Sequence, residues 1–145
     1  MIDYKYCESL TQYSRRKTIE VKVGNIPLGA DNPVRLQSMT NTNTGDVKAT
    51  VDQCIKIIEA GADYVRITVP SVKEAGCLAG ITSSLRSKGY TSPIIADIHF
   101  NPEIAEHCAA IVEKIRINPG NFADRRKHNQ SVYTEKEYNK DVEFL

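Results

Sequence analysis

Two arginines, an aspartate and a histidine lie in short apolar segments and could together bind an anion. Arg66 stands in YVRITV and Arg116 stands in KIRIN, while Asp97 and His99 stand in IIADIHF. A guanidinium group holds phosphate oxygens with two parallel hydrogen bonds. Because burial of an unpaired arginine is costly, the two arginines need partners, and Asp97 and a bound anion are the natural candidates.

Each of these residues also has a purely structural interpretation. Arg66 and Arg116 could pair with carboxylates from other strands or loops. Asp97 could orient His99 or an arginine, or it could take part in a reaction. His99 could be a general acid, a hydrogen-bond donor to a substrate, or a core histidine with satisfied hydrogen bonds. The spacing leaves these alternatives open, with Asp97 and His99 as candidate catalytic residues.

The segment that follows Arg116 is a second candidate for anion binding. Asn118 and Asn121 flank a proline and a glycine. Proline fixes φ and glycine allows a positive φ, so the sequence predicts a tight turn with exposed backbone N–H groups. Two carboxamides beside such a turn could bind phosphate or hydroxyl oxygens.

Alternating strands and helices must position these residues. The apolar periodicity predicts strands at 34–39, 64–69, 94–100 and 114–118, and helices at 44–61, 71–89 and 102–112. Residues 18–29 read as a short hairpin that turns at Gly24-Asn25. Ser71 with Glu74, and Thr134 with Glu137, form capping boxes that indicate helix starts.

This order of elements predicts a parallel sheet with right-handed crossovers. Four βα units are half of a (β/α)8 barrel. The predicted fold is therefore α/β, the N-terminal half of a (β/α)8 TIM barrel preceded by a short β-hairpin. We expect an N-terminal extension at 1–17, the four βα units at 18–122, and a polar segment with the start of a fourth helix at 123–145.

Side chains of each predicted strand alternate between two faces. The more polar face should line the barrel interior, near the strand ends where barrel enzymes hold their active sites. It comprises Arg35, Gln37, Met39, Arg66, Thr68, Ile95, Asp97, His99, Arg116 and Asn118. The other face should lie beneath the helices. It comprises Val34, Leu36, Ser38, Val65, Ile67, Val69, Ile94, Ala96, Ile98, Ile115 and Ile117.

The composition excludes several other classes of protein. The 145 residues are 41% hydrophobic and 26% charged, with a net charge of +1. This balance offers no basic excess for nucleic acid or for an acidic membrane surface. No apolar stretch approaches the length of about 18 residues that spans a bilayer, and the N-terminus lacks the core of a signal peptide. We expect a cytoplasmic protein that binds neither nucleic acid nor membrane.

Four of the segments together resemble a known family. VRLQSMTNTNTGD, YVRITVP, IIADIHF and KIRINPGN are similar, in this order, to the N-terminal barrel domain of the 4-hydroxy-3-methylbut-2-enyl diphosphate synthases, which serve the methylerythritol phosphate route to isoprenoids. The resemblance covers residues 18–122. The tail that follows is similar to the long form of the family, which plants and some bacteria have.

The resemblance implies a reductive ring opening of 2-C-methyl-D-erythritol 2,4-cyclodiphosphate with loss of water. Arg66 and Arg116 would hold diphosphate oxygens. Asn118 and Asn121 would assist them, and His99 would lie near the substrate. A separate C-terminal domain would hold a [4Fe-4S] cluster and supply the electrons, which reduced flavodoxin or ferredoxin delivers. A homodimer is also expected.

The cysteines of this chain do not stand in the family's cluster pattern. They lie far apart in the sequence without a C-x-x-C pair, and we predict reduced and buried side chains for Cys7, Cys54, Cys77 and Cys108. No metal site is therefore predicted in this chain, and the second half of the barrel is also missing. We expect no reductase activity and no bound iron from this polypeptide alone.

Two other functions stay open at the level of the sequence. The pterin-binding synthases share a similar barrel and a similar first strand, so another barrel enzyme with an anionic substrate is one alternative. The other is a half-barrel that has no enzymatic role and only associates with itself. Four βα units cannot close a barrel, and the two outer strands would be unpaired edges.

Overall fold

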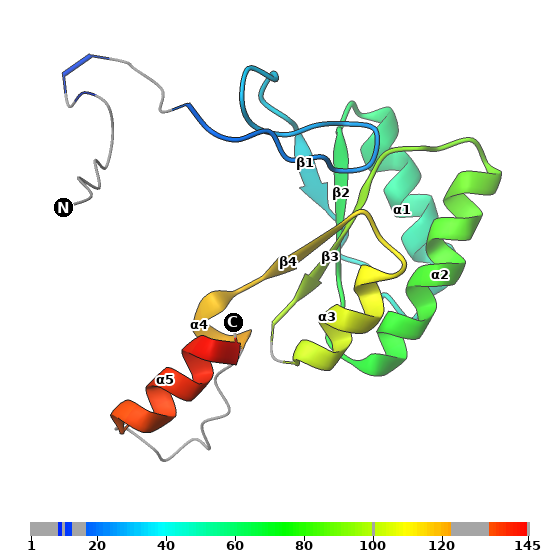
Figure 1. Ribbon diagram of the computed structural model, residues 1–145. Helices are drawn as coiled ribbons and strands as arrows, with labels where there is room; N and C mark the ends of the chain where they lie inside the picture. The colour runs from blue at the N-terminus through cyan, green and yellow to red at the C-terminus, as the bar shows by residue number, and fades with distance from the viewer. Residues whose placement is uncertain (1–8, 10, 13–16, 100, 123–133, 145) are drawn as a thin grey trace.

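A four-stranded parallel sheet with helices on one side forms the body of the molecule (Figure 1). The computed structural model describes residues 9, 11–12, 17–99, 101–122 and 134–144. The strands lie in the order β1 (Gln37–Met39), β2 (Tyr64–Thr68), β3 (Ile94–Ile98) and β4 (Lys114–Ile117). Helices α1 (Val47–Glu59), α2 (Val72–Ser87) and α3 (Pro102–Ala109) alternate with them. The predicted α/β fold, a partial (β/α)8 barrel, is confirmed.

Two further helices follow the last strand. Helix α4 (Pro119–Phe122) is a single turn, and α5 (Glu135–Phe144) comes after the polar segment. The capping box predicted at Thr134 is confirmed, because the Thr134 backbone N–H donates to Glu137 Oε2 at 3.0 Å and the Glu137 N–H donates to Thr134 Oγ1 at 3.3 Å. The backbone hydrogen bond from Thr134 lowers the pKa of Glu137. The proposed division of the chain into three segments stays a prediction.

Local capping explains where the three covering helices begin and end. The Asp46 carboxylate accepts the Ala49 N–H at 3.0 Å, so α1 begins later than predicted. Ser71 and Asn101 cap α2 and α3 as the sequence predicts. Positive φ angles of 96° at Gly61 and 88° at Gly89 place these glycines just beyond the ends of α1 and α2. Helix α3 ends at Ala109, three residues before its predicted end.

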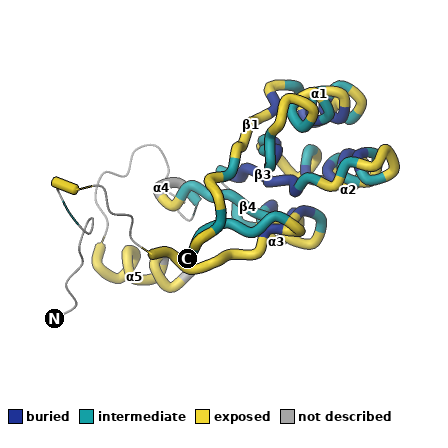
Figure 2. Tube along the Cα trace, turned by 90° about the horizontal axis from the view of Figure 1, so that it is seen from above, coloured by how far each residue is buried: buried dark blue, intermediate teal, exposed yellow. Residues whose placement is uncertain are grey.

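The main apolar core fills the space between the sheet and the three helices. Figure 2 shows the buried residues gathered along β3 and on the inner sides of α1, α2 and α3. The core includes Val65, Ile67, Ile94, Ala96, Ile98, Leu78, Ile81, Leu85, Cys54 and Cys108. The predicted outward face of β2 and β3 is therefore confirmed, and β4 adds Ile115 at the margin of the core.

Two of the described cysteines behave as the sequence predicts. Cys54 and Cys108 are buried free thiols, and burial raises the pKa of Cys54 to about 11 and also raises the pKa of Cys108. Cys77 is free and only half-buried, so the prediction of a buried side chain is wrong there. Cys7 lies outside the described residues.

The first strand departs from the prediction that its apolar residues lie beneath the helices. Strand β1 has three residues, and Val34 and Leu36 are 72% and 62% exposed. The reason lies in the topology: β1 is an edge strand that pairs with β2 alone among the described strands. The outer edge of β1 is left uncovered, beside a groove of about 380 Å³ that Leu36, Ser38 and Ile57 help to line.

The N-terminal hairpin closes the inner face at the N-terminal ends of the strands. It is shorter than predicted, with the single antiparallel bridge Val21–Leu28, and its turn contains Gly24 at a φ of 55°. Val23 packs with Tyr64 and Ile95 in a second buried cluster. The Tyr64 hydroxyl also donates to the Ile26 carbonyl at 2.6 Å. In Figure 1 the hairpin crosses the end of the sheet opposite the strand arrowheads.

We expect Tyr64→Phe to lower the free energy of unfolding by about 1 kcal/mol, the contribution of one buried neutral hydrogen bond. Tyr64 is 2% exposed, so in the variant bulk water cannot reach the Ile26 carbonyl through this position to replace the lost hydrogen bond. Urea unfolding measures the change. Tyr138→Phe is the matched control, because Tyr138 is 61% exposed on α5 and should leave stability unchanged. Equal stabilities of the two variants would contradict the role given to the hairpin contact.

Candidate functional site

A buried carboxylate lies at the centre of the predicted anion site. Asp97 is 2% exposed, and side chains from β2, from β4 and from the residues just after β3 contact it. Arg116 Nη1 donates to Asp97 Oδ1 at 2.9 Å, and Arg66 Nε lies 3.4 Å from Asp97 Oδ2. His99 Nε2 lies 3.5 Å from the same Oδ2 atom. The structure thus brings together all four of the residues that the strand segments singled out.

Strand register explains this convergence. Asp97 on β3 is opposite Arg116 on β4, and it is also opposite Thr68 on β2, two residues beyond Arg66. Side chains that alternate along each strand then point to the same face of the sheet. This is the face away from α1, α2 and α3, the concave side of the half-barrel. The predicted interior position of these residues is confirmed.

The charges at the site do not balance. Arg66 and Arg116 together carry two positive charges, and Asp97 is the one acidic partner that the described contacts give them. The side chains of Arg66, His99 and Arg116 are 29%, 34% and 36% exposed. The buried Asp97 therefore holds the two guanidinium groups at the sheet, while the accessible parts of the arginine side chains face the hollow of the half-barrel. An anion is the ligand that such a surface attracts.

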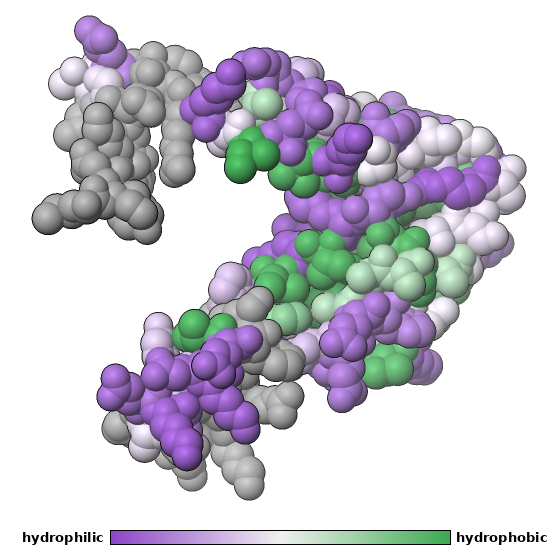
Figure 3. Space-filling view, viewed as in Figure 1, coloured by the Kyte–Doolittle hydropathy of each residue, from purple (hydrophilic) through white to green (hydrophobic). Residues whose placement is uncertain are grey.

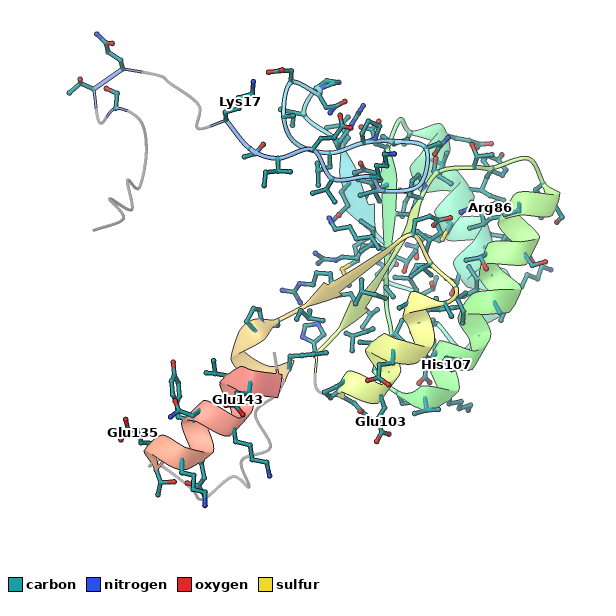
Figure 4. All side chains as sticks on the ribbon, in the orientation of Figure 1. Lys17, Arg86, Glu103, His107, Glu135 and Glu143 are labelled. Carbon is teal, nitrogen blue, oxygen red and sulfur yellow. The ribbon has the colours of Figure 1, made fainter. Side chains whose placement is uncertain are left out.

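The hollow itself is visible on the surface. Figure 3 shows a deep notch between the hairpin end of the molecule and the β4–α4 end, with apolar and polar side chains meeting on its wall. Charged residues on the outer sides of the helices lie away from this notch. Figure 4 shows Glu103 and His107 pointing away from the sheet on the outer side of α3, and both are exposed. His107 is therefore exposed to solvent.

The predicted turn after Arg116 has a different form in the structure. Asn118 follows β4 directly and is half-buried, but Pro119–Phe122 form the helical turn α4 in place of a tight turn with a positive φ. Proline at the first position of a helix explains this, because its fixed φ suits the helical conformation and its missing N–H is not needed there. Asn121 lies in α4, and the structure does not describe its side chain.

The loop between β1 and α1 entered the sequence analysis only as part of a family motif, and the structure ties it to α1 and to the end of β2. The Gln53 Oε1 atom accepts the backbone N–H groups of Asn41 and Thr42 at 2.9 and 3.1 Å. The Thr44 hydroxyl donates to the Thr68 carbonyl at 2.7 Å, which ties the loop to the end of β2. The run of threonine and asparagine in TNTNTGD was the available signal, since these side chains bond readily to nearby backbone groups.

Met39 was predicted to face the interior, but its contact with Arg66 was not foreseen. The Sδ atom accepts from Arg66 Nη2 at 3.1 Å and from Arg66 Nε at 3.3 Å. The two residues are also direct partners in the β1–β2 register. The pairing of β1 with β2 therefore places the Met39 thioether beside the Arg66 guanidinium, where it accepts hydrogen bonds.

The described residues do not fit the iron–sulfur cluster that the resemblance implies. Cys54 and Cys108 are enclosed in the core between the sheet and the helices, where burial disfavours the thiolate form that binds iron. Within the described part of the chain, no three His, Cys, Asp or Glu side chains are grouped so that they could hold a metal ion. No described helix is long and apolar enough to cross a membrane.

Comparison with known proteins agrees with the fold and the motifs. Residues 18–143 match the GcpE TIM-barrel domain. The chloroplastic 4-hydroxy-3-methylbut-2-en-1-yl diphosphate synthase (ferredoxin) of Oryza sativa subsp. japonica is 50% identical over 142 residues, which are 97% of this chain and 19% of that protein. The corresponding flavodoxin-type synthase of Bacteroides thetaiotaomicron is 49% identical over 137 residues, 94% of this chain and 22% of its own length.

A second plant protein gives the same picture. The chloroplastic ferredoxin-type synthase of Arabidopsis thaliana is 48% identical over 142 residues, again 97% of this chain and 19% of the relative. The chain thus spans about a fifth of the length of the curated relatives it matches. The match covers the hairpin, all four strands and the site residues. The chain therefore belongs to the GcpE TIM-barrel family, whose curated members among these relatives are 4-hydroxy-3-methylbut-2-en-1-yl diphosphate synthases.

Proposed function

We propose that this chain is the part of a 4-hydroxy-3-methylbut-2-en-1-yl diphosphate synthase that binds the diphosphate of the substrate. The observation that supports this most is the excess of positive charge around Asp97, where one carboxylate holds two arginines whose side chains are only partly buried. The substrate is 2-C-methyl-D-erythritol 2,4-cyclodiphosphate, and the reaction is its reductive ring opening with loss of water. The family to which the chain belongs supports the choice of substrate.

Each site residue has its own role in binding. Arg66 and Arg116 hold diphosphate oxygens through charged hydrogen bonds, which are the strongest that a neutral-pH site can offer to phosphate. Asn118 and Asn121 add carboxamide donors at the end of β4. His99 lies beside the substrate and donates a hydrogen bond or a proton to it. Asp97 is buried and positions the two arginines.

The electrons and the cluster come from outside this chain in our proposal. Cys54, Cys77 and Cys108 do not form a ligand set, so a [4Fe-4S] cluster would be held by another part of the enzyme, where it supplies the electrons. The relatives are described as ferredoxin and flavodoxin enzymes, and we propose one of these small proteins as the electron donor. A cytoplasmic location stays a prediction.

A hybrid enzyme tests this function. The chain replaces the matched region of the flavodoxin-type synthase of Bacteroides thetaiotaomicron, which is 49% identical to it. We expect the hybrid to convert the cyclic diphosphate, and the same hybrid with Arg116→Ala to bind it at least tenfold more weakly, on the order of one charged hydrogen bond. A folded hybrid with its cluster in place that fails to bind the cyclic diphosphate would refute the proposal.

We also propose that the 145-residue chain associates with itself in solution. Val34 and Leu36, just before the edge strand β1, are 72% and 62% exposed, and β4 has no described partner on its other side. Unpaired edges with apolar side chains favour pairing with another copy. Light scattering should show a dimer or larger species, and Leu36→Lys should shift it toward smaller species. A monodisperse 16.2 kDa species with a concentration-independent melting transition would contradict this.

A further inference from the structure

We infer that Met39 is a positioning residue that orients the Arg66 guanidinium for anion binding. This inference rests on the proposed function of the site, and it adds a residue to which no role in binding has been given so far. Two side chains contact the Arg66 guanidinium. Met39 Sδ accepts from Nη2 at 3.1 Å and from Nε at 3.3 Å, and Asp97 Oδ2 lies 3.4 Å from Nε. The Nη1 group enters none of these contacts.

Core packing does not account for the position of the Met39 side chain. Met39 is 36% exposed on the concave face, and it belongs to neither of the two apolar core clusters. Its partner in the strand register is Arg66 itself, so the pairing of β1 with β2 places the thioether beside the guanidinium. An unbranched methionine side chain can then adjust its sulfur to the donor atoms.

The chemistry of the thioether suits an anion site. Sulfur is a weak acceptor without charge, so it fixes the direction of the guanidinium and leaves its positive charge in place. A carboxylate at the same position would neutralise that charge and compete with the ligand. Asp97 is already shared between Arg66, Arg116 and His99, so a second acid would remove the excess of positive charge on which binding depends.

The first test needs no ligand. The Arg66 Nε–H signal in the NMR spectrum of the chain is identified by its loss in Arg66→Lys, and its exchange with water is then measured. In Met39→Leu, which has a similar volume and no sulfur, we expect exchange several-fold faster than in the unchanged chain. In Met39→Gln an amide oxygen replaces the sulfur as acceptor, and we expect the slow exchange to return. Equal exchange rates in all three proteins would overturn the inference.

The second test measures the consequence for binding. Calorimetric titration with inorganic diphosphate should give an affinity about three- to tenfold weaker in Met39→Leu, the effect of one lost neutral hydrogen bond, and Met39→Gln should restore it. Circular dichroism checks that the variants are folded; if Met39→Leu is not, replacement of methionine by norleucine removes the sulfur with no change of shape. Unchanged affinity without the sulfur rejects the role of Met39. Failure of the unchanged chain to bind diphosphate refutes the proposed function instead, while the exchange rates still test the Met39–Arg66 contact.

Discussion

Asp97→Ala is expected to lower the free energy of unfolding by about 3 kcal/mol, the lower end of the range for breaking a buried ion pair. Asp97 is 2% exposed and holds Arg116 at 2.9 Å and Arg66 at 3.4 Å. Without it, the two positive groups on β2 and β4 lie on either side of β3 with no described acidic partner. The arginine side chains are 29% and 36% exposed, and water at their outer sides keeps the loss below the upper end of the range.

Urea unfolding of matched variants measures this loss. Asp52→Ala removes the same group from the exposed side of α1, and we expect it to change stability by no more than about 0.5 kcal/mol. Inorganic diphosphate should restore part of the stability of Asp97→Ala, because an anion that binds the folded form stabilises it by mass action. If Asp97→Ala and Asp52→Ala lose the same stability, Asp97 does not hold the two arginines together.

Arg116→Ala is expected to raise the dissociation constant of diphosphate about ten- to a hundredfold, the equivalent of one charged hydrogen bond. Lys114→Ala removes an equal charge from the same face of β4 and should change the constant by no more than a few-fold. The strand register separates the two residues. Arg116 is opposite the buried Asp97, whereas Lys114 is opposite Ile95, which packs against the hairpin at the other end of the strands.

Calorimetry with the two variants distinguishes a local site from general attraction. Both variants lower the net charge by one, so any long-range effect of charge on the ligand should be alike in the two. Raising the salt concentration should weaken binding in both without closing the gap between them, because a direct hydrogen bond is screened less than a distant charge. Equal dissociation constants for Arg116→Ala and Lys114→Ala would show that Arg116 does not contact the ligand.

Local sequence patterns account for most of the secondary structure and for the face on which each site residue lies. Alternation along β2 and β3 places Arg66 and Asp97 opposite the apolar face, and the structure agrees. Ser71 and Asn101 begin their helices where their side chains predict it. Such features depend on a few neighbouring residues, because strand periodicity and helix capping are set by the backbone over one or two turns.

Contacts between distant parts of the chain could not be read in the same way. The sequence left open whether Asp97 orients His99 or an arginine, and the structure shows that it contacts His99 and both arginines. The same pairing placed Met39 against Arg66, and the place of β1 at the sheet edge left Val34 and Leu36 exposed where their alternation predicted burial. Alternation assigns a side chain to one face of the sheet. Its contacts and its burial depend on which strands and helices pack beside it, and those elements are far apart in the sequence.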